Sequence, residues 1–134
     1  MPSRIIELHD STIERIATDL EGKIRVAFSS AYIHVSDGTP GIDKGSGFVQ
    51  RAELQVEQGI ISGSLPPFPS DISDGSMVLD GIRRDNTIPI PFEFLGSFNL
   101  LLVFVSGDSM SVQGIGARLS LQGNPKYIEE FPGR

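Results

Sequence analysis

Two histidines carry most of the acid–base chemistry that this sequence offers. His9 stands next to Asp10, and an imidazole beside a carboxylate can serve as a general base or as a metal ligand. Neighbouring residues on a strand point to opposite faces, however, so an extended backbone would keep the two side chains apart. Asp10-Ser11 is also typical of a turn or a helix N-cap. We therefore treat His9 and Asp10 as candidate ligand-binding residues and assign no catalytic residue.

His34 is the second candidate, and it stands two residues after Tyr32, on the same face of any strand that contains both. Gln50 follows the glycine-rich segment 36–47 that leaves this strand, so Tyr32, His34 and Gln50 are predicted to be cross-strand neighbours. In that arrangement Gln50 would orient His34, and the loop would close over a ligand. The alternative is that these residues are the polar ends of ordinary strands.

A metal site would require His9, His34, Asp37 and Asp43 to meet. No spacing among these four residues matches a known ligand motif. The aspartates in segments 37–43 and 71–75 also lack the alternating oxygens and the terminal glutamate of a calcium loop. We therefore predict no metal and no cofactor.

Few residues are available for nucleophilic catalysis. The chain has no cysteine and only two histidines, and it contains no Gly-x-Ser-x-Gly, no phosphate-binding Gly-x-x-x-x-Gly-Lys-Ser/Thr and no His-Glu-x-x-His. This composition favours a binding protein over an enzyme, although paired carboxylates keep acid–base chemistry open.

The charge balance indicates what kind of partner the protein would bind. The 134 residues include 17 acidic and 11 basic side chains, for a net charge of −6. Nucleic-acid binders neutralise phosphates with clustered Lys and Arg, so we expect no nucleic acid and favour a basic protein partner. Charged residues within the first ten positions do not fit a secretion signal. No apolar run approaches the length of a membrane span, and we expect a cytoplasmic protein.

The longest apolar run, residues 98–105, organises the expected fold. Both of its alternating sets of residues are apolar, which predicts a central strand with both faces covered. Gly107-Asp108 is a plausible two-residue hairpin loop into the alternating segment 109–113.

Other segments supply the remaining strands. Segment 12–20 is read as a strand, with a helix from Ser11 as the alternative, and Ser29-Ser30-Ala31 predicts a bulge or bend. Segment 88–94 carries Pro89 and Pro91, which predicts an edge strand beside the central run. The result is one all-β domain over residues 1–134, an antiparallel sandwich or partly open barrel of about nine strands.

An open strand edge predicts self-association. The strand that starts at Ile60, or the one at Met77, can leave an edge or an apolar face uncovered, and two-fold dimers commonly cover such surfaces. We expect a homodimer.

Five segments together resemble a family of short, uncharacterised bacterial all-β proteins. They are His9-Asp10-Ser11, Ala31-Tyr32-Ile33-His34, Gly47-Phe48-Val49-Gln50, Ile88-Pro89-Ile90-Pro91 and Tyr127-Ile128-Glu129-Glu130-Phe131. That family has no established activity, so the resemblance implies no site residue. The opening His-Asp-Ser is also similar to some immunity proteins of bacterial toxin systems, which implies a role in binding a protein partner.

Two functions are therefore carried forward. The first is a non-catalytic binding or interaction module, of an immunity type, that recognises a basic protein. The second is a small-ligand-binding or enzymatic β-barrel with a pocket around His34 and Gln50.

Overall fold

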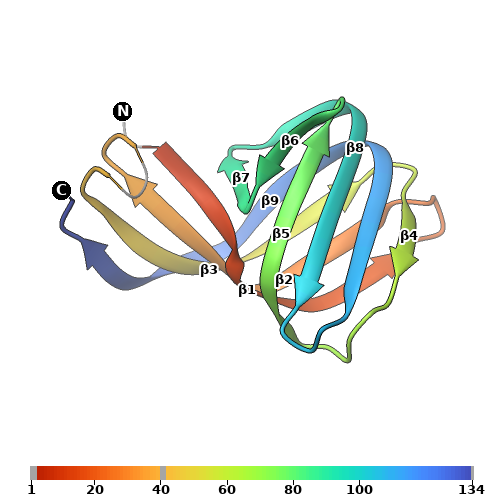
Figure 1. Ribbon diagram of the computed structural model, residues 1–134, viewed down its shortest axis with the longest axis horizontal. Helices are drawn as coiled ribbons and strands as arrows, with labels where there is room; N and C mark the ends of the chain where they lie inside the picture. The colour runs from red at the N-terminus through yellow and green to blue at the C-terminus, as the bar shows by residue number, and fades with distance from the viewer. Residues whose placement is uncertain (1–2, 40–41, 134) are drawn as a thin grey trace.

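A computed structural model describes residues 3–39 and 42–133 of the chain. Nine strands are found in these ranges, and all of them pair antiparallel in one sheet (Figure 1), which confirms the predicted all-β class. The strands are β1 (Ser3–Thr18), β2 (Ile24–Ser36), β3 (Gly45–Val56), β4 (Ile60–Gly63), β5 (Ser70–Leu79), β6 (Ile82–Asp85), β7 (Thr87–Ile90), β8 (Glu93–Phe104) and β9 (Ser109–Phe131). Within the same ranges, no helix is long and apolar enough to cross a membrane.

Six strands close into a ring of hydrogen bonds. The pairings run from β1 through β2, β3, β9, β8 and β5. The ring is completed by a short contact between β5 and β1, in which Thr12 pairs with Asp71 and Ile13 with Ser70. This contact is far shorter than the others, so the ring is a partly open barrel, as predicted. We call this part of the molecule the ring.

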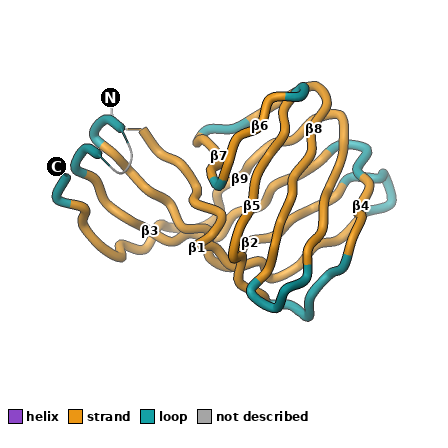
Figure 2. The backbone as a smooth tube through the Cα atoms, viewed as in Figure 1, coloured by secondary structure: helices purple, strands orange, loops and turns teal. Residues whose placement is uncertain are grey.

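Four strands continue beyond the ring and form a second, flatter part. The pairing register shifts in β1 between Glu7 and Thr12, in β2 between Phe28 and Ala31, and in β3 between Val49 and Arg51. The shifts lie opposite one another on neighbouring strands, and bulges bend the strands that contain them. The sheet therefore bends along the line of these bulges. We call the parts of β1, β2, β3 and β9 on the far side of this line from the ring the wing. Figures 1 and 2 show the wing with the start of β1 and the end of β9 near its tip.

The core lies inside the ring and is built by alternation. Inward side chains of β8 (Phe98, Leu100, Leu102 and Phe104) meet those of the other strands, and all four are at most 1% exposed. Phe28 of β2, Leu54 of β3, Met77 of β5 and Val112 of β9 belong to the same buried cluster. Residues 48–57 alternate in polarity, which predicts one buried face, and the structure confirms this for Ala52, Leu54 and Val56, whereas Phe48 and Gln50 are half-buried.

The prediction that both faces of segment 98–105 are covered is wrong. The strand is central, between β5 and β9, but Val103 is 39% exposed and Val105 69% exposed. A closed ring has one inner and one outer face, and the outer face of β8 is open to solvent. The hairpin also differs from the prediction: Phe104 and Asp108 pair through a 2.8 Å hydrogen bond, so the loop is Val105–Gly107, with Gly107 at φ +95°, as three-residue hairpins favour.

The proline-containing segment does not form the predicted strand beside β8. Residues 87–90 form β7, which pairs with the outer edge of β1 at the opposite end of the sheet order, and Glu93 and Phe94 already belong to β8. The edge position is confirmed, because β7 is the last strand on that side. Proline lacks an N–H to donate, so Pro89 suits a strand with one free edge.

Several further expectations were settled by the structure. Segment 12–18 is strand, so the helix alternative from Ser11 is wrong, and the bulge predicted at residues 29–31 is confirmed. Residues 70–75 belong to β5, although their Ser, Asp and Gly content is typical of a turn, and β9 runs from 109 to 131 as one strand despite its three glycines. Residues 40 and 41 of the predicted loop 36–47 lie outside the described residues.

Candidate functional site

One face of the wing carries a hollow with a volume of about 340 Å³. Carboxylates and rings from the three strands β1, β2 and β9 and from the tip of the wing line it: Glu7, Asp10, Tyr32, His34, Asp43, Glu129, Phe131, Pro132 and Gly133. The register explains this assembly, because Glu7 pairs with Tyr32 and His34 with Gly47, while Gly47 pairs in turn with Glu129. Directly paired residues point to the same face of a sheet.

A wide bulge in β1 presents His9 and Asp10 at the edge of this hollow. Glu7 pairs with Tyr32 and Thr12 pairs with Ser30, so β1 advances by five residues where β2 advances by only two. The surplus residues break the alternation that would separate neighbouring side chains. As a result, the imidazole Nε2 of His9 lies 3.1 Å from a carboxylate oxygen of Asp10, and the prediction that the two side chains stay apart is wrong.

Ser11 holds the bulge from inside. Its hydroxyl donates to the carbonyl oxygen of Glu7 at 2.8 Å and accepts from the backbone N–H of Tyr32 at 3.0 Å. The side chain is buried, so one hydroxyl replaces the backbone partners that the bulge removes from the ladder. The sequence indicated a turn or N-cap at Asp10-Ser11, and the structure shows a serine that satisfies a strand irregularity instead.

Asn86 fastens the outer side of the same bulge. Its carbonyl oxygen accepts the N–H of Leu8 at 2.7 Å, and its side-chain oxygen accepts the N–H of His9 at 2.8 Å. Asn86 has a positive φ of 60°, a conformation that Asn tolerates better than most residues. The backbone that carries His9 and Asp10 is thus fixed from two sides.

His34 lies behind Glu7 and is almost fully buried. Its side chain is 6% exposed, its Nδ1 lies 3.8 Å from Oε1 of Glu7, and its ring stacks on Phe131 with 4.5 Å between the centroids. Nε2 of His34 is buried and has no hydrogen-bond partner among the described residues. A buried polar atom without a partner costs free energy, so this imidazole calls for an explanation other than packing.

Tyr32 spans the floor of the hollow. Its hydroxyl donates a 2.5 Å hydrogen bond to the carboxylate of Glu129. Burial, and next this hydrogen bond, raise the pKa of Tyr32 well above its ordinary value of 10.0. Gly47 makes the contact possible, since a Cβ at this position would lie 2.1 Å from the Tyr32 hydroxyl.

Gln50 does not join this group. It pairs with Ala31 and faces the opposite side of the wing, where it lines a separate hollow with Ile33 and Phe48. Its side-chain amide donates to the carbonyl oxygen of Gly123 at 2.8 Å. The predicted neighbourhood of Gln50, Tyr32 and His34 is therefore wrong for Gln50, because one step along a strand reverses the face, whereas Tyr32 and His34 do share a face.

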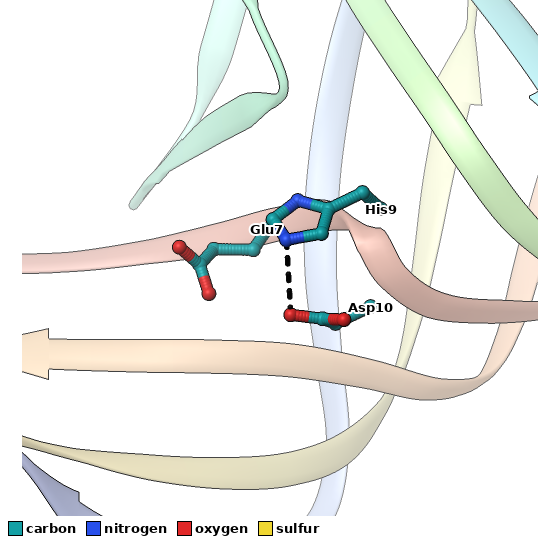
Figure 3. A group of neighbouring side chains, drawn as sticks. All are labelled: Glu7, His9 and Asp10. Carbon is teal, nitrogen blue, oxygen red and sulfur yellow. Dashed lines mark ion pairs between the residues drawn. The ribbon is translucent and has the colours of Figure 1, made fainter.

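The potential metal ligands also group differently from the expectation. Ligand atoms of Glu7, His9 and Asp10 all lie within 4.8 Å of one another (Figure 3). Asp43 lines the hollow, while Asp37 does not. Glu7 and Glu129 were missed by sequence reasoning. Glu7 stands two residues before His9, which was a usable signal, but nothing local connects Glu129 to Tyr32.

The comparisons with other proteins identify no relative. Neither protein-family models, nor curated protein sequences, nor solved structures give a match to this chain.

Proposed function

We propose that the wing binds a cationic segment of a basic partner protein through the hollow on its acidic face. The observation that carries this proposal is the convergence of four carboxylates, Glu7, Asp10, Asp43 and Glu129, around one hollow. An immunity-type role, in which the protein caps a basic toxin surface, would use such a face, and it remains part of the proposal.

The charge of this face supports the proposal, because it is not balanced by the protein's own lysines and arginines. The ion pairs of Lys and Arg in residues 3–39 and 42–133 go to other carboxylates: Lys23 to Glu57, Arg25 to Asp19 and Glu53, Arg51 to Glu14, and Arg83 to Asp85. Glu7 and Asp10 pair only with histidines in those ranges. Carboxylates without a lysine or arginine partner attract a positively charged protein and speed its association.

Arginine fits the hollow better than lysine. A guanidinium group can donate to two carboxylates at once and can lie against an aromatic ring, and the hollow combines carboxylates with the half-buried ring of Phe131. Six of the nine residues that line the hollow lie on strands, so little conformational entropy is lost when these side chains bind a partner.

The second candidate, a ligand-binding or enzymatic barrel, has weaker support. The inside of the ring is filled by apolar side chains, and Gln50 lies on the other face of the wing from His34. If the protein binds a small ligand, the geometry favours a cationic one in the same hollow.

The test compares two double variants that remove the same amount of charge. Glu7→Gln/Glu129→Gln changes the hollow, and Glu21→Gln/Glu93→Gln, called the ring variant, changes two exposed glutamates outside the wing. A short labelled polyarginine peptide is titrated with each protein by fluorescence anisotropy at physiological ionic strength, in EDTA. We expect the wing variant to bind at least about tenfold more weakly than wild type, about 1.4 kcal/mol, and the ring variant to change little. Equal weakening in both would show that net charge alone attracts the peptide and would refute the proposal.

A further inference from the structure

Glu7, His9 and Asp10 together have the composition and spacing of a metal site. We propose that this cluster binds a first-row transition-metal dication, with Zn²⁺ as the representative ion. One ligand atom from each residue lies within 4.8 Å of the other two, and Figure 3 shows the imidazole of His9 and the two carboxylates approaching one another at the bulge.

The distance between His9 and Asp10 is close to the one that a metal imposes. Two ligands that each lie about 2.0–2.1 Å from one ion at a tetrahedral angle are about 3.4 Å apart. His9 Nε2 and Asp10 Oδ2 are 3.1 Å apart, so an ion can join them with a small rotation of either side chain. An imidazole with carboxylates suits Zn²⁺ and its neighbours in the first row, whereas Mg²⁺ prefers oxygen ligands alone.

His34 is a second observation beside the cluster, because its buried imidazole faces one of the proposed ligands. This imidazole is buried, directs Nδ1 toward Oε1 of Glu7 at 3.8 Å, and leaves Nε2 without a partner among the described residues. Buried N–H groups without an acceptor are rare, which favours the tautomer with the proton on Nδ1, facing the carboxylate. Metal-binding carboxylates are commonly hydrogen-bonded by a second layer of residues that orients them, and His34 is placed to orient Glu7.

The backbone of the site is prepared before any ion arrives. Ser11 and Asn86 hold the bulge by four hydrogen bonds of 2.7–3.0 Å, so binding requires only side-chain rotation. The side chains of His9 and Asp10 are 44% and 50% exposed, which leaves a path for the ion and room for water in the remaining coordination positions. Zinc sites with three protein ligands hold a water molecule in the fourth position.

This inference does not rest on the proposed partner, although the metal site and the hollow share Glu7 and Asp10. His9 belongs to the metal cluster and does not line the hollow that would receive a cationic segment. The two ideas can therefore fail separately. His9→Ala should abolish the metal site and leave peptide binding in EDTA unchanged, whereas Glu129→Gln should do the reverse.

The test is calorimetric titration of the metal-free protein with Zn²⁺ at neutral pH. We expect one Zn²⁺ per chain, with affinity reduced at least about tenfold by His9→Ala and by Asp10→Asn and retained in Glu129→Gln, which alters the same hollow outside the cluster. Circular dichroism checks that each variant is folded, and both substituted side chains are exposed enough for this to be expected.

Two further measurements sharpen the result. Co²⁺ added in place of Zn²⁺ should give visible absorption bands that are absent from the His9→Ala spectrum, because the imidazole is then no longer a ligand. Mg²⁺ should not compete with Zn²⁺. Zn²⁺ binding that is equally strong in wild type, His9→Ala and Asp10→Asn, or equally weakened in Glu129→Gln, would overturn the site in favour of a general acidic surface.

Discussion

Ser11→Ala is the substitution that most directly tests how the wing is built. The methyl group of alanine fits where the serine side chain lies, but it removes a hydroxyl that donates to the carbonyl of Glu7 at 2.8 Å and accepts from the N–H of Tyr32 at 3.0 Å. Because Ser11 is 1% exposed, water cannot easily replace it. The Tyr32 N–H would then be buried without an acceptor.

The expected cost follows from these two contacts. A hydrogen bond in a protein contributes about 1 kcal/mol net, and a buried donor left without a partner costs about 1–3 kcal/mol. We therefore expect Ser11→Ala to lower the free energy of unfolding by about 2–3 kcal/mol, a large part of the roughly 5–15 kcal/mol typical of a domain.

Urea unfolding followed by circular dichroism measures this loss. Ser73→Ala is the matched control, since the hydroxyl of Ser73 donates to the carbonyl of Val103 at 3.1 Å in an exposed setting, where a loss within about 0.5 kcal/mol is expected. Hydrogen exchange should also show the Tyr32 amide losing protection in Ser11→Ala. A loss below about 0.5 kcal/mol together with wild-type exchange at Tyr32 would refute the role given to Ser11.

Three further predictions concern the ring, the wing and the assembly. Leu102→Asp should abolish cooperative folding, because it buries an unpaired carboxylate in the core, while Val103→Asp on the outer face of the same strand should stay folded by circular dichroism. Folding raises the pKa of Tyr32, so the protonated phenol contributes its full stabilisation of the folded state below pH 10.0. This contribution is lost as the pH rises above that value. The stability difference between wild type and Tyr32→Phe should therefore shrink by about 1 kcal/mol from pH 10 to 11 in urea titrations, and a constant difference would argue against the buried phenol. Light scattering should give twice the chain mass of 14.5 kDa if the predicted homodimer forms, and a monomer mass at high micromolar concentration would exclude it.

Local sequence was enough to predict several strands of the ring. Alternating apolar residues, as at Ala52, Leu54 and Val56, must lie on one face of an extended backbone, and that face was correctly assigned to the core. The small residues at 29–31 likewise indicated the bulge that the structure has in β2. These features depend on residues close together in the chain, so a pattern of a few residues contains the information.

Sequence patterns could not decide which surfaces face solvent or which distant segments pair. Val103 and Val105 look like core residues, yet they lie on the outside, because closure of the sheet into a ring leaves the outer face of β8 uncovered. The proline-containing strand was correctly placed at an edge, but its neighbour is β1 rather than β8. The missing N–H of proline requires a strand with one unpaired edge, but it does not determine which strand pairs with the other edge.

The candidate site shows most clearly which features follow from local sequence and which depend on the tertiary structure. The sequence by itself identified His9, Asp10, Tyr32 and His34 as candidates, because the chain has only two histidines and the other two residues stand close to them in sequence. Only the tertiary structure decided that His9 meets Asp10, that Glu7 and Glu129 complete the group, and that Gln50 faces away. The physical reason is register: a bulge of a few residues changes which side chains share a face, and its size depends on hydrogen bonds to Ser11 and Asn86 that no local pattern encodes.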